Sequence, residues 1–303
     1  MGGGKWSTHV YKETEAARKA TGTSAFAYSE EAKKTGNLKA HDSLNPFGVQ
    51  FRESRDSAEH PESNAVTVLF DVTGSMRQVP VILQQHLPQL LGLLLYKNYI
   101  PHPQILFGAV GDAVSDRVPL QVGQFESDNR MDQHLQNMVL EGGGGVYGME
   151  SYELALYFMA RHIKMDCWEK RKNKGYLFMI GDEMPYPSVK YTETNSIIDA
   201  GLQSNIPTQD IIQQVKEKYN LYFIIPQNTS GGDNPKVFKR WADLIGEQHI
   251  IKLEKAENIA QMIALAIGTN EGTIDLTQGA EDLREMGADD TDVDTVTRAL
   301  TLR

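Results

Sequence analysis

The segment DVTGSM, residues 71–76, carries oxygen-bearing side chains at alternate positions: Asp71, Thr73 and Ser75. In an extended turn that leads into a helix, alternate side chains can present their oxygens to one point. Gly74 permits the tight turn, and the start of the following helix adds backbone N–H donors. Carboxylate and hydroxyl oxygens suit the hard cations Mg²⁺, Mn²⁺ and Ca²⁺. The alternative interpretation is an ordinary helix cap, because Asp, Ser and Thr also favour helix starts.

Further polar residues follow the other predicted strands and a glycine run at 142–145. Ligands of parallel α/β sheets bind at the carboxyl ends of the strands, so these side chains are expected to converge on one rim. Carboxylates brought together there need a cation to offset their repulsion. Among them, Asp112 is expected to be either an ordinary turn residue or a support behind the ligands, and Glu183 is expected to be a solvated neighbour. The residues in question are Asp112, Asp116, Glu150, Ser151, Asp182 and Glu183.

Predicted strands and helices alternate between residues 65 and 268. Short apolar, β-branched runs predict strands that are buried on both faces, and the longer segments between them predict helices. This alternation predicts the α/β class, with a doubly wound, mostly parallel central sheet flanked by helices. The predicted strands are 65–70, 104–112, 175–183, 220–227 and 249–253, and the predicted helices are 76–99, 128–139, 150–163, 207–219, 234–246 and 257–268.

With its oxygen-rich motif directly after the first strand, the sequence resembles the von Willebrand factor A-like (VWA) domains over about residues 64–268. These Rossmann-like domains have a metal-ion-dependent adhesion site with an Asp-x-Ser/Thr-x-Ser motif, which DVTGSM matches. The stretch MIGDEMPYP resembles the family's third metal-site loop. The second loop, 142–151, has no threonine, so by comparison with some relatives a Glu or Ser replaces it. The metal ligands that the resemblance implies are Asp71, Thr73, Ser75, Asp182 and Glu150, with Ser151 as the alternative to Glu150.

The resemblance implies a binding module and not an enzyme. In the family, the bound cation, here Mg²⁺ or else Mn²⁺ or Ca²⁺, keeps one coordination position open for an Asp or Glu of a protein partner. Stand-alone domains of this type in bacteria and phages resemble adaptors or assembly factors for AAA+ ATPases.

Two other functions stay open at this point. One is a metal-dependent phosphoester hydrolase, because clustered carboxylates with Mg²⁺ can activate a water molecule. The other is a structural protein that assembles into a homo-oligomer, in which an acidic residue from 281–294 of a neighbouring copy fills the open position.

The composition excludes several classes of protein. The chain has 303 residues, a formal charge of −10 and one cysteine. The acidic balance argues against nucleic-acid and anionic-membrane partners, and one cysteine cannot form an internal disulfide. The polar start has no signal peptide, and the most apolar predicted helix is too short and too polar to span a bilayer. The sequence therefore predicts a cytoplasmic protein.

Charge and composition divide the chain into three parts. Residues 1–64 have a net charge of zero, residues 65–268 a net charge of −4, and residues 269–303 a net charge of −6. The polar N-terminal extension 1–64 is expected to lie over the surface of the VWA-like domain 65–268, with a short helix at 11–20. The acidic C-terminal tail 269–303 is expected to be flexible or to form one weak helix.

Other reactive residue types show no pattern that indicates chemistry. The eight histidines have no metal-ligand spacing, and Cys167 has no obvious histidine partner that would make it a nucleophile. The glycine run 142–145 lacks the Gly-Lys-Ser/Thr ending of a nucleotide-binding loop, so it is predicted to be a rim loop. Arg77 is the one cation beside the first motif that a phosphate could use.

Overall fold

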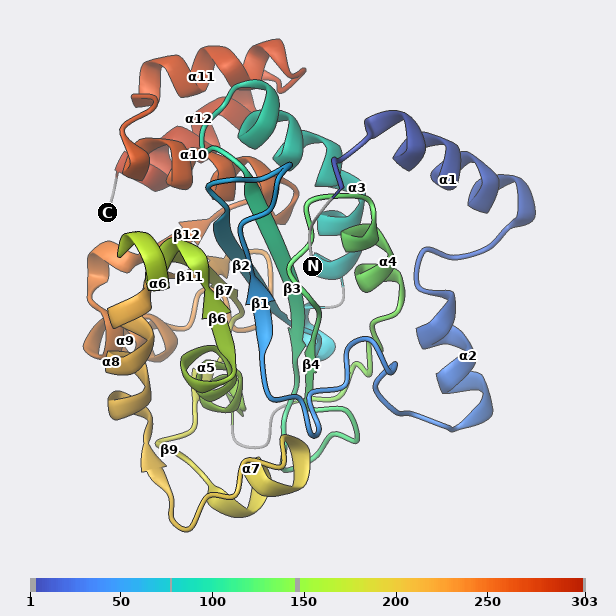
Figure 1. Ribbon diagram of the computed structural model, residues 1–303, viewed down its shortest axis with the longest axis vertical. Coiled ribbons are helices and arrows are strands. Elements are labelled where there is room, and N and C mark those ends of the chain that lie inside the picture. Colours follow the sequence, from blue (N-terminus) through green and yellow to red (C-terminus); the bar gives the residue numbers. More distant parts are fainter. Residues whose placement is uncertain (1–3, 77, 145–147, 302–303) are drawn as a thin grey trace.

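The computed structural model describes residues 4–76, 78–144 and 148–301, so Arg77 and Gly145 lie outside the described residues. A six-stranded sheet forms the centre of the chain (Figure 1). All neighbouring strands run parallel except the last pair, which is antiparallel. The fold is therefore mixed α/β with a mostly parallel central sheet, as the sequence predicts. In spatial order the strands are β12 (Ile250–Leu253), β11 (Tyr219–Pro226), β7 (Gly175–Ile180), β2 (Asn64–Asp71), β3 (Pro103–Val110) and β4 (Leu120–Val122).

Side chains of β2 alternate between two buried clusters. Val66, Val68 and Phe70 belong to one cluster, and Ala65 and Leu69 belong to the other. A period of two is the geometry of a strand, and burial on both sides explains why this run is apolar throughout. The sheet is therefore covered on both faces.

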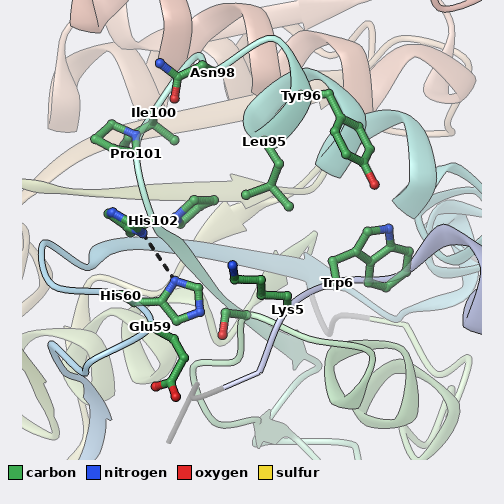
Figure 2. Close-up of a pocket in the computed structure, with 12 residues that line it drawn as sticks. Lys5, Trp6, Glu59, His60, Leu95, Tyr96, Asn98, Ile100, Pro101 and His102 are labelled. Atoms are coloured by element: carbon green, nitrogen blue, oxygen red, sulfur yellow. Dashed lines mark hydrogen bonds between the residues drawn. The ribbon is translucent and has the colours of Figure 1, made fainter.

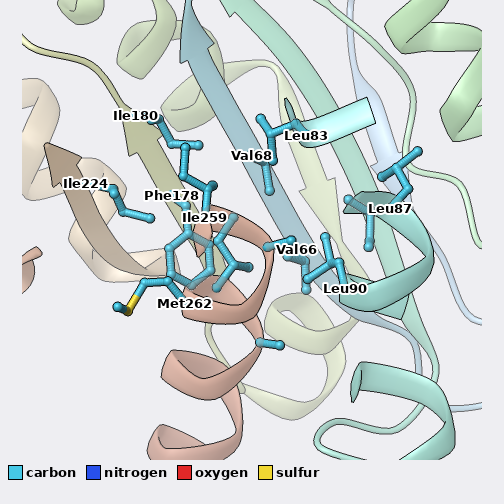
Figure 3. Close-up of a cluster of buried hydrophobic side chains, with 14 of the residues drawn as sticks. Val66, Val68, Leu83, Leu87, Leu90, Phe178, Ile180, Ile224, Ile259 and Met262 are labelled. Carbon is cyan, nitrogen blue, oxygen red and sulfur yellow. The ribbon is translucent and has the colours of Figure 1, made fainter. Parts of the chain in front are cut away.

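Helices pack against both faces of the sheet. In Figure 3, Leu90 of one helix lies beside Val66, and Ile259 of another lies beside Phe178, so two different helices cover one face of the sheet. None of the helices in the described ranges is both long and apolar enough to cross a membrane. The first face is covered by α3 (Val79–Leu91), α4 (Arg130–Gln136) and α10 (Ile259–Glu271), and the second by α5 (Tyr152–Arg161), α8 (Thr208–Lys218) and α9 (Pro235–Ile245).

The position of β2 brings the polar loops together. β2 lies between β3 and β7 and runs parallel to both, so the carboxyl ends of the three strands meet at one edge of the sheet. The register pairs Asp71 with Val110 of β3 and Phe70 with Ile180 of β7. The loops that follow these strands therefore start side by side.

The segment after β2 is more broken than the single helix predicted over 76–99. It consists of a 3₁₀ turn at Gly74–Met76, the helix α3, and a π-helical turn at Gly92–Tyr96. Pro80 fits the first turn of α3, where backbone N–H groups have no helical partner. Pro88 lies inside α3 and removes one helical hydrogen bond shortly before the π turn begins.

Several short elements have no counterpart in the sequence prediction. Two- or three-residue strands are too short to show a hydrophobic period, and the two short helices carry mixed polar residues. They are β1 (Arg52–Ser54) paired with β6 (Ile163–Met165), β5 (Met149–Glu150) with β8 (Met184–Pro185), β9 (Ser188–Val189) with β10 (Ile206–Pro207), and the helices α6 (Asp166–Arg171) and α7 (Tyr191–Ile197).

The N-terminal segment folds as two helices, α1 (Thr8–Thr21) and α2 (Ala27–Thr35), which lie along the side of the molecule near α3 and α4 (Figure 1). α1 contains the helix predicted over 11–20. Tyr11 is buried, and its hydroxyl donates to the backbone oxygen of Gln84 in α3 at 2.7 Å. Trp6 belongs to the buried cluster on the first face of the sheet, the face that α3 and α10 cover. These two aromatic side chains anchor the segment.

The prediction of a flexible tail or one weak helix for residues 269–303 is wrong. α10 continues to Glu271, and two further helices follow, α11 (Leu276–Glu285) and α12 (Asp290–Thr301). They bury apolar side chains in the first cluster because the few apolar residues of the tail lie on one helical face. Lys255 also pairs with Asp292 at 2.8 Å. The buried residues are Leu283, Val293, Val296 and Leu300.

Candidate metal-binding site

Asp71 ends β2 and is fully buried. Its Oδ1 accepts hydrogen bonds from the backbone N–H of Thr73 at 2.7 Å and from the Thr73 hydroxyl at 2.5 Å. Its Oδ2 accepts one from the hydroxyl of Tyr152 at 2.7 Å. Burial raises the pKa of Asp71 to about 7, although these three hydrogen bonds oppose the shift. Asp71 and Thr73 therefore already form one oxygen cluster.

Ser75 connects this cluster to the loop after β7. Its hydroxyl donates to Oδ1 of Asp182 at 2.8 Å, and the backbone N–H of Gly231 donates to Oδ2 at 2.9 Å. A Cβ at Gly231 would lie 2.2 Å from the backbone oxygen of Asp182, so only glycine permits this approach. Asp182 lies close enough to Asp71 to raise the pKa of that carboxyl. Four of the residues predicted as ligands therefore come together.

The glycine-rich loop lies against the first loop through its backbone. Gly74 N–H donates to the oxygen of Gly143 at 2.5 Å, and Gly142 N–H donates to the oxygen of Val72 at 3.2 Å. These contacts agree with the prediction of a rim loop for this stretch. They also bring the strand β5, which ends in Glu150, to the edge of the same site.

Glu150 is fully buried, and neither of its side-chain oxygens has a hydrogen-bond partner in the described structure. Burial, together with the negative charges of Asp71 and Glu183, raises its pKa to about 10. Buried polar atoms are almost always paired, so two unpaired carboxyl oxygens mark a place where a cation would be stabilising.

Ser151, the alternative to Glu150, has other contacts. Its hydroxyl oxygen accepts from the backbone N–H of Ala113 at 2.9 Å and lies 3.5 Å from Oδ1 of Asp112. It therefore holds the loop after β3 in place. Among the described residues of the second loop, Glu150 is left as the side chain whose oxygens have no partner.

The loop after β3 places two more carboxylates at this rim. Asp112 is buried and accepts from the hydroxyls of Ser115 at 3.0 Å and Tyr186 at 3.1 Å. Asp116 accepts from the backbone N–H of Asp112 at 2.8 Å. Both charges raise the pKa of Glu150. This loop therefore adds two negative charges near the site.

Glu183 differs from its predicted role as a solvated neighbour. It is half-buried, and its Oε2 is buried without a hydrogen-bond partner in the described structure. Burial raises its pKa to about 7, together with the charges of Asp71 and Asp182. It belongs to the acidic rim and not to the open surface.

Carboxylates alone do not complete a site here. Within residues 4–76, 78–144 and 148–301, no three His, Cys, Asp or Glu side chains form a group that could hold a metal ion. The donor set instead combines two carboxylates with two hydroxyls, and the carboxyl of Glu150 lies nearby. An all-oxygen set of this kind fits Mg²⁺, Mn²⁺ or Ca²⁺.

Two contributors to the site are absent from the sequence prediction. Tyr152 orients Asp71 through its hydroxyl, and Gly231 donates its N–H to Asp182. Tyr152 follows Glu150 and Ser151 directly, which is the one signal that could have indicated it. Nothing in the sequence around Gly231 indicates a contact with a loop 49 residues earlier.

No protein-family model and no curated protein sequence matches the chain. Its fold resembles that of a pilus adhesin. Two structures of the adhesin SpaC from Lactobacillus rhamnosus GG, one of them in an open conformation, match 72% of this chain with a TM-score of 0.50, at 9% and 10% identity. The chain spans 31% and 32% of the length of these adhesin chains.

A third match is proximal thread matrix protein 1 from the mussel byssus, with a TM-score of 0.44 and 12% identity over 68% of this chain and 47% of its own. At such low identities the likeness to the adhesin concerns the fold alone, and the match to the mussel protein supports no conclusion.

Proposed function

We propose that the chain is a VWA-like domain with a doubly wound, Rossmann-like sheet, and that it binds a divalent cation at a metal-ion-dependent adhesion site. The observation that carries this proposal is the meeting of the two loops after β2 and β7, where the Ser75 hydroxyl contacts Asp182 beside Asp71 and Thr73. The unpaired, buried carboxyl of Glu150 is the second support. The ligands proposed are Asp71, Thr73, Ser75 and Asp182, with Glu150 as a fifth whose carboxyl would move toward the other four when the cation binds, because the three carboxylates are not grouped in the described structure.

The proposed role is that of a protein-interaction module and not of an enzyme. A bound Mg²⁺, or else Mn²⁺ or Ca²⁺, would offset the charges of the rim and attract a carboxylate from a partner's Asp or Glu. The chain's own residues orient the site: Thr73 and Tyr152 hold Asp71, and Gly231 holds Asp182. On the family resemblance alone, we propose that the partner belongs to an AAA+ ATPase complex in the cytoplasm, with this chain as adaptor or assembly factor.

Calorimetry on the purified chain tests the metal site. The wild type is expected to bind about one equivalent of Mg²⁺ or Mn²⁺, and Asp71→Ala is expected to abolish this binding because it removes a carboxylate that the site cannot replace. Asp243→Ala is the matched control, since Asp243 is an exposed acid that pairs with Lys239 on α9. Equal binding by wild type and Asp71→Ala would contradict the assignment of Asp71 as a metal ligand.

Tyr152→Phe tests the proposed orientation of Asp71. The substitution removes one hydroxyl and keeps the ring, so the chain should stay folded. We expect Mg²⁺ affinity to fall about tenfold, because groups that orient metal ligands typically contribute that much. Calorimetry against the wild type measures the change, and an unaltered affinity would show that Thr73 alone suffices to hold Asp71.

The partner can be sought through the same chemistry. Proteins retained by the immobilised chain in Mg²⁺ and released by EDTA are candidates, and immobilised Asp71→Ala should not retain them. An AAA+ ATPase subunit among them would support the assigned class. If the same proteins are retained in EDTA and by immobilised Asp71→Ala, their contact with the chain does not pass through a metal ion.

A further inference from the structure

A second candidate site lies at the opposite end of the sheet, before the amino ends of β2 and β3. A pocket of about 340 Å³ opens there between the N-terminal segment, the loop before β2 and the turn before β3 (Figure 2). Cavities of this size are in the range of ligand sites. Its lining includes Lys5, Trp6, Glu59, His60, Tyr96 and His102.

Two histidines face each other in this pocket. The Nδ1 atoms of His60 and His102 lie 3.4 Å apart (Figure 2). His60 is buried, and its Nε2 lies 2.8 Å from the backbone oxygen of Gly4. Because a carbonyl oxygen can only accept, Nε2 carries the hydrogen. A neutral His60 therefore directs the Nδ1 lone pair toward His102.

We propose that His60 and His102 bind one divalent transition-metal ion of the Zn²⁺ type through their Nδ1 atoms. Tetrahedral Zn²⁺ with Zn–N bonds of about 2.0–2.1 Å places two ligand nitrogens roughly 3.3–3.4 Å apart, which matches the separation of the pair. Without an ion the two Nδ1 atoms form a long hydrogen bond, drawn as the dashed line in Figure 2, and an ion would replace the proton between them. Imidazole nitrogen is a preferred ligand of Zn²⁺, Co²⁺, Ni²⁺ and Cu²⁺.

The surroundings of the pair support metal binding. Metal-binding histidines commonly donate their other ring N–H to a backbone carbonyl, as His60 does to Gly4. That carbonyl is itself held by the hydroxyl of Ser127 at 2.7 Å. The imidazole of His60 is therefore oriented before any ion arrives.

The backbone fixes the second histidine. The oxygen of His102 accepts from the N–H of Asn64 at 3.0 Å. His102 and Asn98, in the same turn, have left-handed backbone conformations with φ of 47° and 55°. Such conformations are uncommon away from glycine and concentrate at functional sites. The turn thus holds the imidazole of His102 opposite His60.

The chain supplies two ligands, and the pocket leaves space for water at the other positions. Glu59 points its carboxylate away from the pair (Figure 2). No third His, Cys, Asp or Glu of the described residues joins the two histidines, so two ligands of the ion would come from the chain and the others from water. Lys5 lines the same pocket, but it is exposed, and solvent screens its repulsion of a cation.

The test uses the tag-free full chain carrying Asp71→Ala, which removes the site at the other end of the sheet. Zn²⁺ calorimetry should show about one equivalent bound, and Co²⁺ should give the visible absorption of a nitrogen-ligated ion. His102→Asn in this background should weaken Zn²⁺ binding at least about tenfold. Asparagine is chosen because it tolerates the left-handed backbone.

Two further variants make the result decisive. His60→Asn should lose binding to the same extent, whereas His9→Asn should not, because His9 is an exposed histidine on α1. The same titrations on the otherwise wild-type chain in excess Mg²⁺ check that Asp71→Ala has not altered the fold. Absence of Zn²⁺ binding by the parent, or equal affinity in His102→Asn and His9→Asn, would overturn the proposal.

Discussion

Without metal, the Glu150→Met variant should be more stable than the wild type. In Mg²⁺, it should be less stable than the wild type. Without metal, the wild type keeps a buried carboxyl whose two oxygens have no partner in the described structure. An unpaired buried polar group costs about 1–3 kcal/mol, so an apolar side chain of similar length should raise the free energy of unfolding by that amount.

In saturating Mg²⁺, the wild type should have a larger free energy of unfolding than Glu150→Met. A ligand at 1,000 times its dissociation constant adds about 4.1 kcal/mol to the stability of the protein that binds it, which exceeds the advantage of Glu150→Met without metal. Glu150→Met lacks one proposed ligand and should gain much less. Urea unfolding of both proteins in EDTA and in Mg²⁺ measures the four stabilities.

Glu153 provides the matched control for this experiment. It lies three residues away, is equally buried, and accepts a hydrogen bond from the backbone N–H of Tyr186 at 3.1 Å. Glu153→Met should therefore destabilise the chain by about 1–3 kcal/mol with or without metal, because it leaves that N–H unpaired. If Glu150→Met behaves in the same way in EDTA, Glu150 has a partner and the metal argument loses its second support.

The parts of the fold that the sequence predicts are those with strong local signals. The five parallel strands are apolar runs that need burial on both faces, and the motif DVTGSM carries its ligands within five residues. Their approximate positions follow from period and composition alone. Parallel pairing then brings the loops after β2 and β7 together, so Asp182 could be expected beside Asp71.

The parts that escape prediction depend on contacts between distant segments. β4 is a three-residue strand whose pairing with β3 carries no period of its own. The helices α11 and α12 have few apolar residues, and their stability comes from the surface that α10 offers them. Composition alone therefore favoured a loose tail.

The histidine pair shows the same limit at the level of single side chains. His60 and His102 are 42 residues apart and have no spacing that suggests a joint site. They meet because the register of β2 and β3 pairs Asn64 with Pro103, which aligns the turns before both strands. Register is a property of the folded sheet, so no local pattern could reveal this pair.

Replacing Trp241 by alanine should lower the free energy of unfolding by about 3–5 kcal/mol, which is the usual cost of removing a large buried aromatic side chain. Trp241 is fully buried in α9 and stacks on Phe223, with ring centroids 3.9 Å apart. Its ring also meets the ring of Tyr152 at 5.6 Å, and its Nε1–H donates to the backbone oxygen of Glu183 at 2.9 Å. One side chain therefore supports two parts of the metal site.

Loss of Trp241 should for this reason weaken Mg²⁺ binding as well as stability. Without its ring, Tyr152 is free to shift, and Asp71 loses the hydroxyl that orients it. Phe178→Ala is the control, because Phe178 is equally buried but packs on the other face of the sheet. Urea unfolding should give similar losses for both variants, whereas calorimetry below the unfolding range should show weakened metal binding for Trp241→Ala alone. Equal metal affinity in the two variants would mean that the site is held by its own loops, independently of the aromatic cluster beneath it.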